Sequence, residues 1–462
     1  MKILRIFISL VLSFLITCKD PQAHTLLLSN NGCTLDGETL SISPISGVSI
    51  GVSKNITITQ PGSFNISGEF EGQVVVRLGD DEEATLIFRN ATINCPFGPA
   101  VLFESAREFD PNTYKKNTSI TYDQAKALDF TTAGAKVIIG DDSVNFINGS
   151  YTETYDGAFF STVSMVVSGE KKGNGELRIY GTSEGLDSKK HMLITGGKII
   201  VAAEDDGINA SDDWGSVVIV QGGVLRINGG LGREGDGIDS NGFLIINGGD
   251  VIAASKPMAD SGLDSQLGLY INGGRAIGVG TPMDTAEKDC KQAAMNLCFD
   301  LNVEPNALLE IKDKDGNVVV SFSPNTAGFL ENTEVHDYYG MTISMPEFTV
   351  GETYHFYLDG EQLGFTSNDP SPGPGPGPGP GPGPGPVPPG PDPPGPPPND
   401  TEVKENGGNN LRGNVNDDAQ EIKADFYMNQ TVVYFTGIKK LSVGSFLRNK
   451  YVYLAVIILS LF

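Results

Sequence analysis

Apolar and polar residues alternate along much of the chain, and between residues 173 and 280 the alternation recurs at a fixed interval. Gly-Gly pairs mark each unit at spacings of 26, 26 and 25 residues, at positions 196–197, 222–223, 248–249 and 273–274. Two and four residues after each pair the side chain is small or apolar, while the position between them admits Arg226. This alternation is typical of a strand with one buried face. A fixed repeat of this length indicates a solenoid or array.

Each unit contains two more strand-like segments. One ends in a polar residue directly before the Gly-Gly pair: Thr195, Gln221, Asn247 and Asn272. The other carries a Gly-apolar-Asx pattern at residues 185–188, 207–210, 237–240 and 262–265. No unit holds an amphipathic helical stretch, which excludes leucine-rich and ankyrin arrays. Three short strands per unit, stacked about 4.8 Å apart, predict an all-β fold, a parallel β-helix.

The pattern sets approximate limits for the fold. Looser alternation upstream, as at residues 55–59, predicts a parallel β-helix over residues 40–283. Residues 284–366 contain strand-like segments with turn sequences at 314–317 and 359–360, which predicts a small C-terminal antiparallel β subdomain.

The N-terminus predicts a secreted protein. Residues 1–23 contain Lys2 and Arg5 followed by an apolar run, which is typical of a signal peptide. Eight Asn-x-Ser/Thr sequons, including one at Asn209, favour a eukaryotic secretory route. The cysteines that remain after the leader predict two disulfides, which in the simplest pairing are Cys33–Cys95 and Cys290–Cys298.

The C-terminal part predicts a surface tether. Residues 371–398 are almost wholly Pro and Gly with a period of two, which excludes collagen and predicts a partly extended stalk with a reach of at most about 80 Å. A polar segment, 399–450, leads to an apolar tail, 451–462, too short to span a bilayer as a helix. The tail matches the removable signal of a glycolipid (GPI) anchor; the alternative is a buried terminal strand.

The charge of the chain limits its partners. The formal net charge of −25 argues against nucleic acid and against anionic membrane surfaces as direct partners. Within residues 196–272 there are 11 acidic and four basic residues, a local balance of −7. An acidic ligand would therefore need a bridging cation.

The Gly-apolar-Asx segments carry several of these acidic residues. Stacking of the units would place Asp187, Asn209, Asp239 and Asp264 at equivalent positions on successive coils. Neighbouring carboxylates about 5 Å apart repel one another unless they are solvated, protonated or bound to a cation. Carboxylates and the carbonyls of glycine-rich turns suit Ca²⁺, whereas the alternative is an exposed acidic corner whose side chains cap turns.

Several motifs together resemble a bacterial family of β-helical carbohydrate-binding domains. They are the runs 56–59, 62–68, 72–76, 98–101, 193–199 and 315–318, the segment 351–354 and the Asp-Gly-Ile repeats. Members bind cellulose and polygalacturonate, carry calcium and share their right-handed coil with pectate lyases. The resemblance implies calcium ligands at Asp187, Asp206, Asn209, Asp236, Asp239 and Asp264.

The resemblance implies calcium-assisted binding of a plant-type polysaccharide by a secreted, surface-tethered protein. Candidate ligand contacts are Trp214, Arg226, Arg233 and Tyr270. The first alternative is a calcium-dependent lyase, which needs a basic residue to remove the proton beside a uronate carboxylate; Lys198 and Lys256 are the lysines near the repeat acids. A structural surface adhesin without a sugar ligand is the second alternative. We predict binding without catalysis.

Overall fold

The computed structural model describes residues 23–109, 119–212, 215–257, 260–281, 284–366 and 422–441. This part of the chain is mostly β, with one short α-helix, α2 (Tyr122–Ala125), and two 3-10 turns, η1 (Phe130–Thr132) and η2 (Pro324–Thr326). None of its helices is long and apolar enough to cross a membrane. The predicted signal peptide up to residue 22, the Pro-Gly stalk and the terminal tail lie outside the described residues.

Three ladders of mainly parallel strands run along the molecule. The first is the eight-stranded sheet β4 (Val48–Ile50), β5 (Asn55–Ile58), β7 (Gln73–Arg77), β9 (Val101–Ser105), β12 (Gly157–Ser161), β15 (Glu184–Ser188), β18 (Ile208–Ala210) and β21 (Ile238–Ser240). The second contains β1 (His24–Leu28), β6 (Gly62–Glu71), β8 (Ala84–Asn94), β10 (Ala135–Ile139), β13 (Met165–Gly169), β16 (Met192–Ile194), β19 (Val217–Val220), β22 (Phe243–Ile246) and β24 (Gly268–Ile271). The third continues from the ends of β6 and β8 through β11 (Val144–Gly149), β14 (Glu176–Gly181), β17 (Lys198–Ala203), β20 (Val224–Asn228), β23 (Asp250–Ala254) and β25 (Arg275–Gly280).

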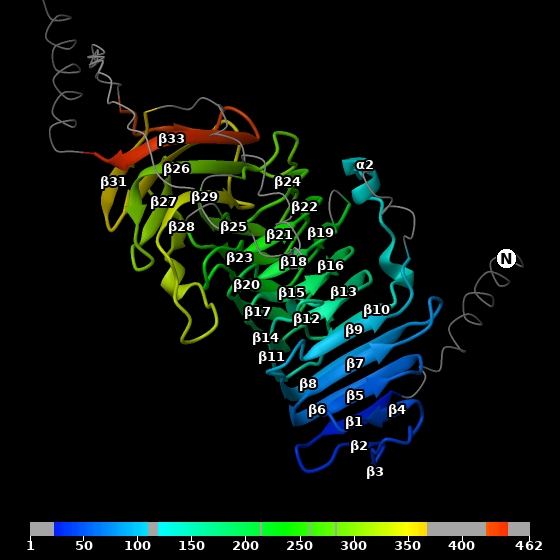
Figure 1. Ribbon diagram of the computed structural model, residues 1–462. Coiled ribbons are helices and arrows are strands. Elements are labelled where there is room, and N and C mark those ends of the chain that lie inside the picture. The colour runs from blue at the N-terminus through cyan, green and yellow to red at the C-terminus, as the bar shows by residue number, and fades with distance from the viewer. Residues whose placement is uncertain are drawn as a thin grey trace, which may run out of the picture.

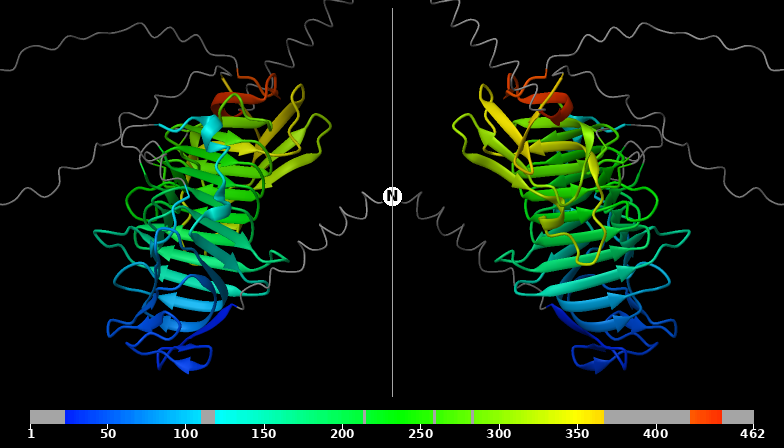
Figure 2. Two further views of the ribbon diagram at one scale, coloured as in Figure 1. Left: turned by 90° about the vertical axis from the view of Figure 1, so that its right-hand side faces the viewer. Right: turned by 90° about the vertical axis from the view of Figure 1, so that its left-hand side faces the viewer.

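The register of these ladders follows the sequence repeat. Ile199 pairs with Leu225 and Leu225 with Val251, so equivalent residues of successive 26-residue units lie side by side. In the side views of Figure 2 the strands of successive units lie one above another. These large parallel sheets, almost without helix, are consistent with the β-helix that the repeat predicts.

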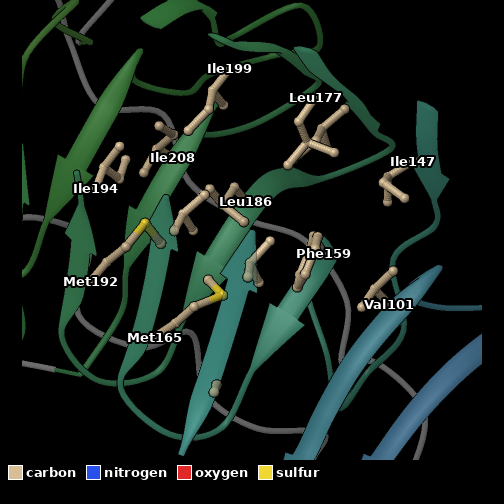
Figure 3. Close-up of a cluster of buried hydrophobic side chains, with 14 of the residues drawn as sticks. Val101, Ile147, Phe159, Met165, Leu177, Leu186, Met192, Ile194, Ile199 and Ile208 are labelled. Carbon is tan, nitrogen blue, oxygen red and sulfur yellow. The ribbon is translucent and has the colours of Figure 1, made fainter. Parts of the chain in front are cut away.

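The interior is filled by stacked apolar side chains. Met165 and Met192 of the second ladder lie beside Leu186 and Ile208 of the first (Figure 3), and all four are fully buried. Burial of each such side chain stabilises the fold by about 1.5–3 kcal/mol. Because one unit cannot enclose such a core alone, the coils depend on their neighbours.

Antiparallel strands cover both ends of the stack (Figure 1). At the N-terminal end β1 pairs with β2 (Thr34–Leu35), which pairs with β3 (Glu38–Thr39). At the other end β25 pairs with β29 (Tyr338–Ser344), and β29 pairs with β26 (Ala294–Val303). A small antiparallel group follows, made of β27 (Leu309–Asp313), β28 (Val318–Phe322), β30 (Thr353–Leu358) and β31 (Glu361–Gly364). Pairing removes the open strand edges that would otherwise invite aggregation.

The chain returns to this end of the molecule after the Pro-Gly region. Residues 422–441, within the predicted polar segment, contain β32 (Phe426–Tyr427) and β33 (Val432–Lys440). β33 pairs in parallel with β26 and antiparallel with β31, and its side chains Val432, Phe435 and Ile438 are buried. Phe365 and Lys423 form an isolated bridge, so the two ends of the intervening segment are adjacent.

A segment on either side of α2 crosses the outer face of the second ladder. Ile120, Ala125 and Phe130 pack against Ile219 and Ile245 on that face. Thr121 and Gln124 form a capping box that stabilises the first turn of the helix. The segment therefore covers an apolar outer face that sequence periodicity did not reveal.

All four cysteines of the described residues are free, so the two predicted disulfides are absent. β6 lies between β1 and β8 in the ladder, which separates the loop of Cys33 from Cys95 at the end of β8. Cys290 lies in a loop where its Sγ accepts a hydrogen bond from the Ile271 amide at 3.1 Å, whereas Cys298 lies in the middle of β26. A strand rises about 3.3 Å per residue, so these two thiols are held far apart.

Candidate functional site

One column on the outward side of the first ladder changes from apolar to acidic along the stack. Leu102 pairs with Phe160 and Phe160 with Asp187, which then aligns with Asn209 and Asp239. Leu263 forms a bridge to Ile238, so Asp264 follows on the next coil. The register therefore places the four predicted Asx residues on successive coils, and the acidic part begins at Asp187.

The first acidic group is Asp156, Glu184 and Asp187. One oxygen from each lies within 4.8 Å of the others. Glu184 and Asp187 are buried in β15, and the Ser211 hydroxyl donates a hydrogen bond to Asp187 Oδ1 at 3.3 Å. This group therefore concentrates two buried carboxyls and a third, partly exposed one.

The second group is Asp236, Asp239 and Asp264, again with one oxygen each within 4.8 Å. All three are partly exposed. Glycine amides of one coil donate to the carbonyls of Asp206, Asp236 and Ser261 on the next, all at 3.0 Å, so these three residues occupy equivalent positions. Serine thus replaces the carboxylate on the last of these coils.

Asn209 and Asp206 lie between the two groups. Asn209 Nδ2 donates hydrogen bonds to Glu184 Oε1 at 2.8 Å and to Asp206 Oδ2 at 3.1 Å. Asp206 Oδ1 accepts from the Asp236 amide at 2.7 Å, so both of its oxygens have protein donors. Asp206 therefore orients its neighbours, and the oxygens best placed for a cation belong to the two groups.

The donor set fits a hard cation. Glu184 Oε2, Asp187 Oδ2 and Asn209 Oδ1 are buried oxygens that receive no hydrogen bond from a protein donor among the described residues. The Glu184 and Asp187 carboxyls face each other, so a shared proton is the alternative to a cation. A buried oxygen without a partner is costly, and a carboxylate more so, unless a cation satisfies it. Oxygen-only ligands of this kind suit Ca²⁺. Glu184, Asp187 and Asn209, with Asp156, could hold one ion, and Asp236, Asp239 and Asp264 a second.

Burial and mutual repulsion raise the pKa of the carboxyls in this region. Burial, followed by the charge of Asp187, raises the pKa of Glu184. Burial raises the pKa of Asp187 to about 7 and that of Asp205 to about 6. Burial and the charge of Asp206 raise the pKa of Asp239. A cation would oppose these shifts, since it favours the ionised form.

The predicted sugar contacts lie in different places. Arg226 is held in an ion pair with Asp250 at 2.6 Å and donates to the Ala327 carbonyl at 2.6 Å, which links the coil to the C-terminal part. Tyr270 stacks on Tyr122 of α2 with ring centroids 3.7 Å apart. Both side chains are partly exposed and are held by these contacts within the protein. Arg233 is exposed on the loop that precedes Asp236, and Trp214 lies outside the described residues.

Among the acidic residues that gather here, Glu184, Asp156 and Asp284 were absent from the predicted set of ligands. Asp156 precedes a glycine, as Asp206 and Asp236 do, but Gly157 pairs with Glu184, which shifts Asp156 by one position from their column. Burial, followed by the neighbouring carboxyl of Asp264, raises the pKa of Asp284 to about 9. It carries no Asp-Gly signal, because it follows the last repeat unit.

Two comparisons with known proteins found a match, one to a family model and one to a solved structure. A family model described as carbohydrate-binding domain-containing protein matches residues 53–298, which include both acidic groups. Among solved structures, a polysaccharide lyase-like protein from C. thermocellum, solved as a gadolinium derivative, matches with 18% identity and a TM-score of 0.39. The match covers 55% of this chain and 93% of that one. No curated protein matches the chain.

Proposed function

The chain belongs to the family of carbohydrate-binding domain-containing proteins, and from this premise we propose that it binds a plant-type polysaccharide, cellulose or a pectic polyuronate, with the help of calcium. We place this activity outside the cell, on a surface-tethered protein. The observation that carries the proposal is the set of buried, unpartnered oxygens on Glu184, Asp187 and Asn209 inside the matched region. Such oxygens favour a structural cation over an exposed acidic corner.

The two acidic groups suit different tasks. Glu184 and Asp187 are buried, so an ion there would stabilise the coil. Asp236, Asp239 and Asp264 are partly exposed, so an ion there could keep coordination positions for a ligand. Calcium, when bound, supplies positive charge and coordination positions for oxygen donors.

A bridging ion would reconcile the charge of the protein with an acidic polymer. The net charge of −25 repels a polyuronate. Exposed charges more than about 8 Å away are screened at physiological salt, so a local cation can outweigh them. In this proposal a uronate carboxylate completes the ion shell that Asp236, Asp239 and Asp264 begin.

The test compares polygalacturonate and cellulose binding with calcium and with EDTA. Polygalacturonate should bind only with calcium, and Asp239→Asn should weaken it by about tenfold while cellulose binding changes less. Asp315→Asn removes the same charge from an exposed turn between β27 and β28 and should bind like wild type. Tight polygalacturonate binding in excess EDTA would contradict calcium bridging, and equal losses for both polymers would point to damage to the coil.

Catalysis by a lyase mechanism has weaker support. Lys198 Nζ donates to Glu176 Oε2 at 2.8 Å, an ion pair of neighbouring strands. Lys256 Nζ donates to the Gly232 carbonyl at 2.6 Å on the acidic side of the molecule. Incubation with calcium and polygalacturonate should give no unsaturated product, and a rise in its absorbance that disappears in Lys256→Ala would establish the lyase.

A further inference from the structure

A cavity of about 550 Å³ opens at the ends of β8, β11 and β14, which are stacked on one edge of the molecule (Figure 1). Its size is in the range of small-molecule sites. It is lined by polar and apolar residues of four successive coils, among them Glu71, Asn94, Phe97, Asn148, Tyr180 and Thr182. We refer to it as the Phe97 cavity.

Phe97 is exposed in a rigid turn. Its side chain is 51% exposed, although it is large and apolar. Pro96 and Pro99 flank it, and the turn is fixed by hydrogen bonds from the Cys95 amide to the Asn148 carbonyl at 2.8 Å and from the Ser150 amide to the Gly98 carbonyl at 2.9 Å. A turn fixed in this way loses little backbone entropy when a ligand covers the ring.

Amides and hydroxyls surround the ring. Asn148 Nδ2 donates to Asn94 Oδ1 at 2.6 Å, which leaves each amide further hydrogen-bonding capacity. The Tyr180 hydroxyl donates to Glu204 Oε1 at 3.2 Å, so the ring of Tyr180 is oriented. A flat apolar surface with a few fixed polar groups matches a sugar ring, which has apolar C–H faces and a rim of hydroxyls.

The charges of the lining cancel. Lys54 Nζ lies 3.9 Å from Glu71 Oε2, and these two are the ionisable side chains of opposite sign in the lining. The cavity therefore offers no net positive charge to a uronate carboxylate. Neutral sugar residues suit it better.

The cavity adjoins the first acidic group along the chain. Thr182 in the lining is two residues from Glu184, and Ser150 begins the turn that leads to Asp156. The Tyr151 amide donates to Thr182 Oγ1 at 3.0 Å, which ties these two turns together. A polysaccharide could therefore pass from the cavity to the acidic corner.

We propose that the Phe97 cavity binds neutral sugar residues of the polysaccharide through stacking on Phe97, independently of the acidic groups. This inference rests on the proposed function, and it adds a subsite that calcium removal leaves intact.

The experiment measures cellohexaose binding by calorimetry with calcium and with EDTA. The protein is produced in a host that attaches no N-glycans, because Asn148 begins a sequon. Phe97→Ala should weaken binding by about tenfold in both conditions, since the stacking surface is lost. Phe97→Leu keeps an apolar side chain but loses the flat ring, and should weaken it as well. Tyr427→Ala removes an equally exposed aromatic residue, 50% exposed, from β32 and should bind like wild type.

The other possible results of the binding experiment contradict either the neutral subsite or the proposed function. Wild-type affinity in Phe97→Ala, or loss of cellohexaose binding in EDTA, overturns the cavity as a neutral subsite. Binding of polygalacturonate without cellohexaose does the same but leaves the proposed function standing. Absence of binding to any polysaccharide overturns the proposed function itself. An N-glycan found on Asn148 of the natively secreted protein would fill the cavity and also overturn the inference.

Discussion

Asn209 lies in a sequon, yet its side chain is only 5% exposed and its Nδ2 donates to Glu184 and Asp206. Glycan attachment would replace one of the two N–H groups of Nδ2, so Glu184 or Asp206 would lose its hydrogen bond, and the attached sugar would have no room beside the buried side chain. Asn429, which also begins a sequon, is exposed in the turn before β33. In protein secreted from a eukaryotic host, glycopeptide mapping should find Asn209 unmodified and Asn429 modified. A glycan on Asn209 would show that the acidic column is open when the chain passes through the secretory pathway.

The acidic groups also predict a pH-dependent need for metal. Without divalent cations, Asp187 and Asp205 titrate near pH 7 and pH 6 in the folded protein, against about 3.9 in the unfolded chain. The folded state then binds more protons between about pH 4 and pH 7, so the free energy of unfolding falls as the pH rises through this window. Calcium keeps the carboxylates ionised and removes this fall.

Calorimetric melting tests this expectation. In EDTA the melting temperature should fall between pH 5 and pH 8, whereas in excess calcium it should stay nearly constant. At 100 times its Kd, calcium adds about 2.7 kcal/mol, which corresponds to roughly 4 °C at pH 8 for a fold of this size. Asp187→Asn should reduce the fall in melting temperature in EDTA, because the neutral amide cannot ionise in the buried site. Equal pH slopes in calcium and EDTA would show that no cation binds these groups.

Among the structural elements, the turns with Gly-Gly pairs set the stacking distance of the coils. Gly223 has φ of +98°, and a Cβ there would lie 2.8 Å from the Gly197 carbonyl of the preceding coil. Gly316 has a similar φ of +86° in an open turn with nothing within 4 Å of a Cβ. Gly223→Ala should therefore destabilise the protein by about 2 kcal/mol more than Gly316→Ala in urea unfolding, since both share the backbone strain and only the first has the clash. Equal losses would mean that the coils can separate at little cost.

The sequence predicted the repeated elements better than the unique ones. The Gly-Gly spacing placed Ile199, Leu225 and Val251 in one column, and the ladder pairs them in that register. Periodicity cannot reveal elements that occur once, such as the segment around α2 or β33, because their position depends on the surface they cover. The prediction of two disulfides was wrong for a related reason, because a count of cysteines says nothing about which strands lie between them.

The candidate site was predictable to the same extent. The column Asp187, Asn209 and Asp239 follows from the repeat, and so does the Asp206 position. Asp284 lies beyond the repeat, and Phe97 belongs to an N-terminal coil where the pattern is loose. Their neighbourhood depends on how loops of different lengths fold onto the stack, which single-chain patterns do not encode.

At the scale of the whole molecule, β33 should hold to the fold without a covalent link to β31. Its buried side chains, Val432, Val433, Phe435 and Ile438, each contribute about 1.5–3 kcal/mol. A protease site inserted between residues 371 and 398 and then cut should leave the C-terminal fragment bound, and the two pieces should co-elute in gel filtration until denaturant is added. Phe435→Asp should release the fragment after cleavage but not before. Immediate loss of the wild-type fragment would show that the strand pairing is too weak to hold it.

The return of the chain at β33 changes how a mechanical load would travel. If the protein is anchored through residues beyond Leu441, tension enters the fold at the end of β33 and passes through its hydrogen bonds to β26 and β31. The Pro-Gly region bears no load in that state, because Phe365 and Lys423 hold its two ends together. If a strong pull detaches β33, the 55 residues from 367 to 421 come under tension and add up to about 180–200 Å of length. At low force the paired strand would keep the sugar-binding surface close to its anchor. At high force its detachment would lengthen the tether, so the surface could follow a moving polymer without losing the anchor.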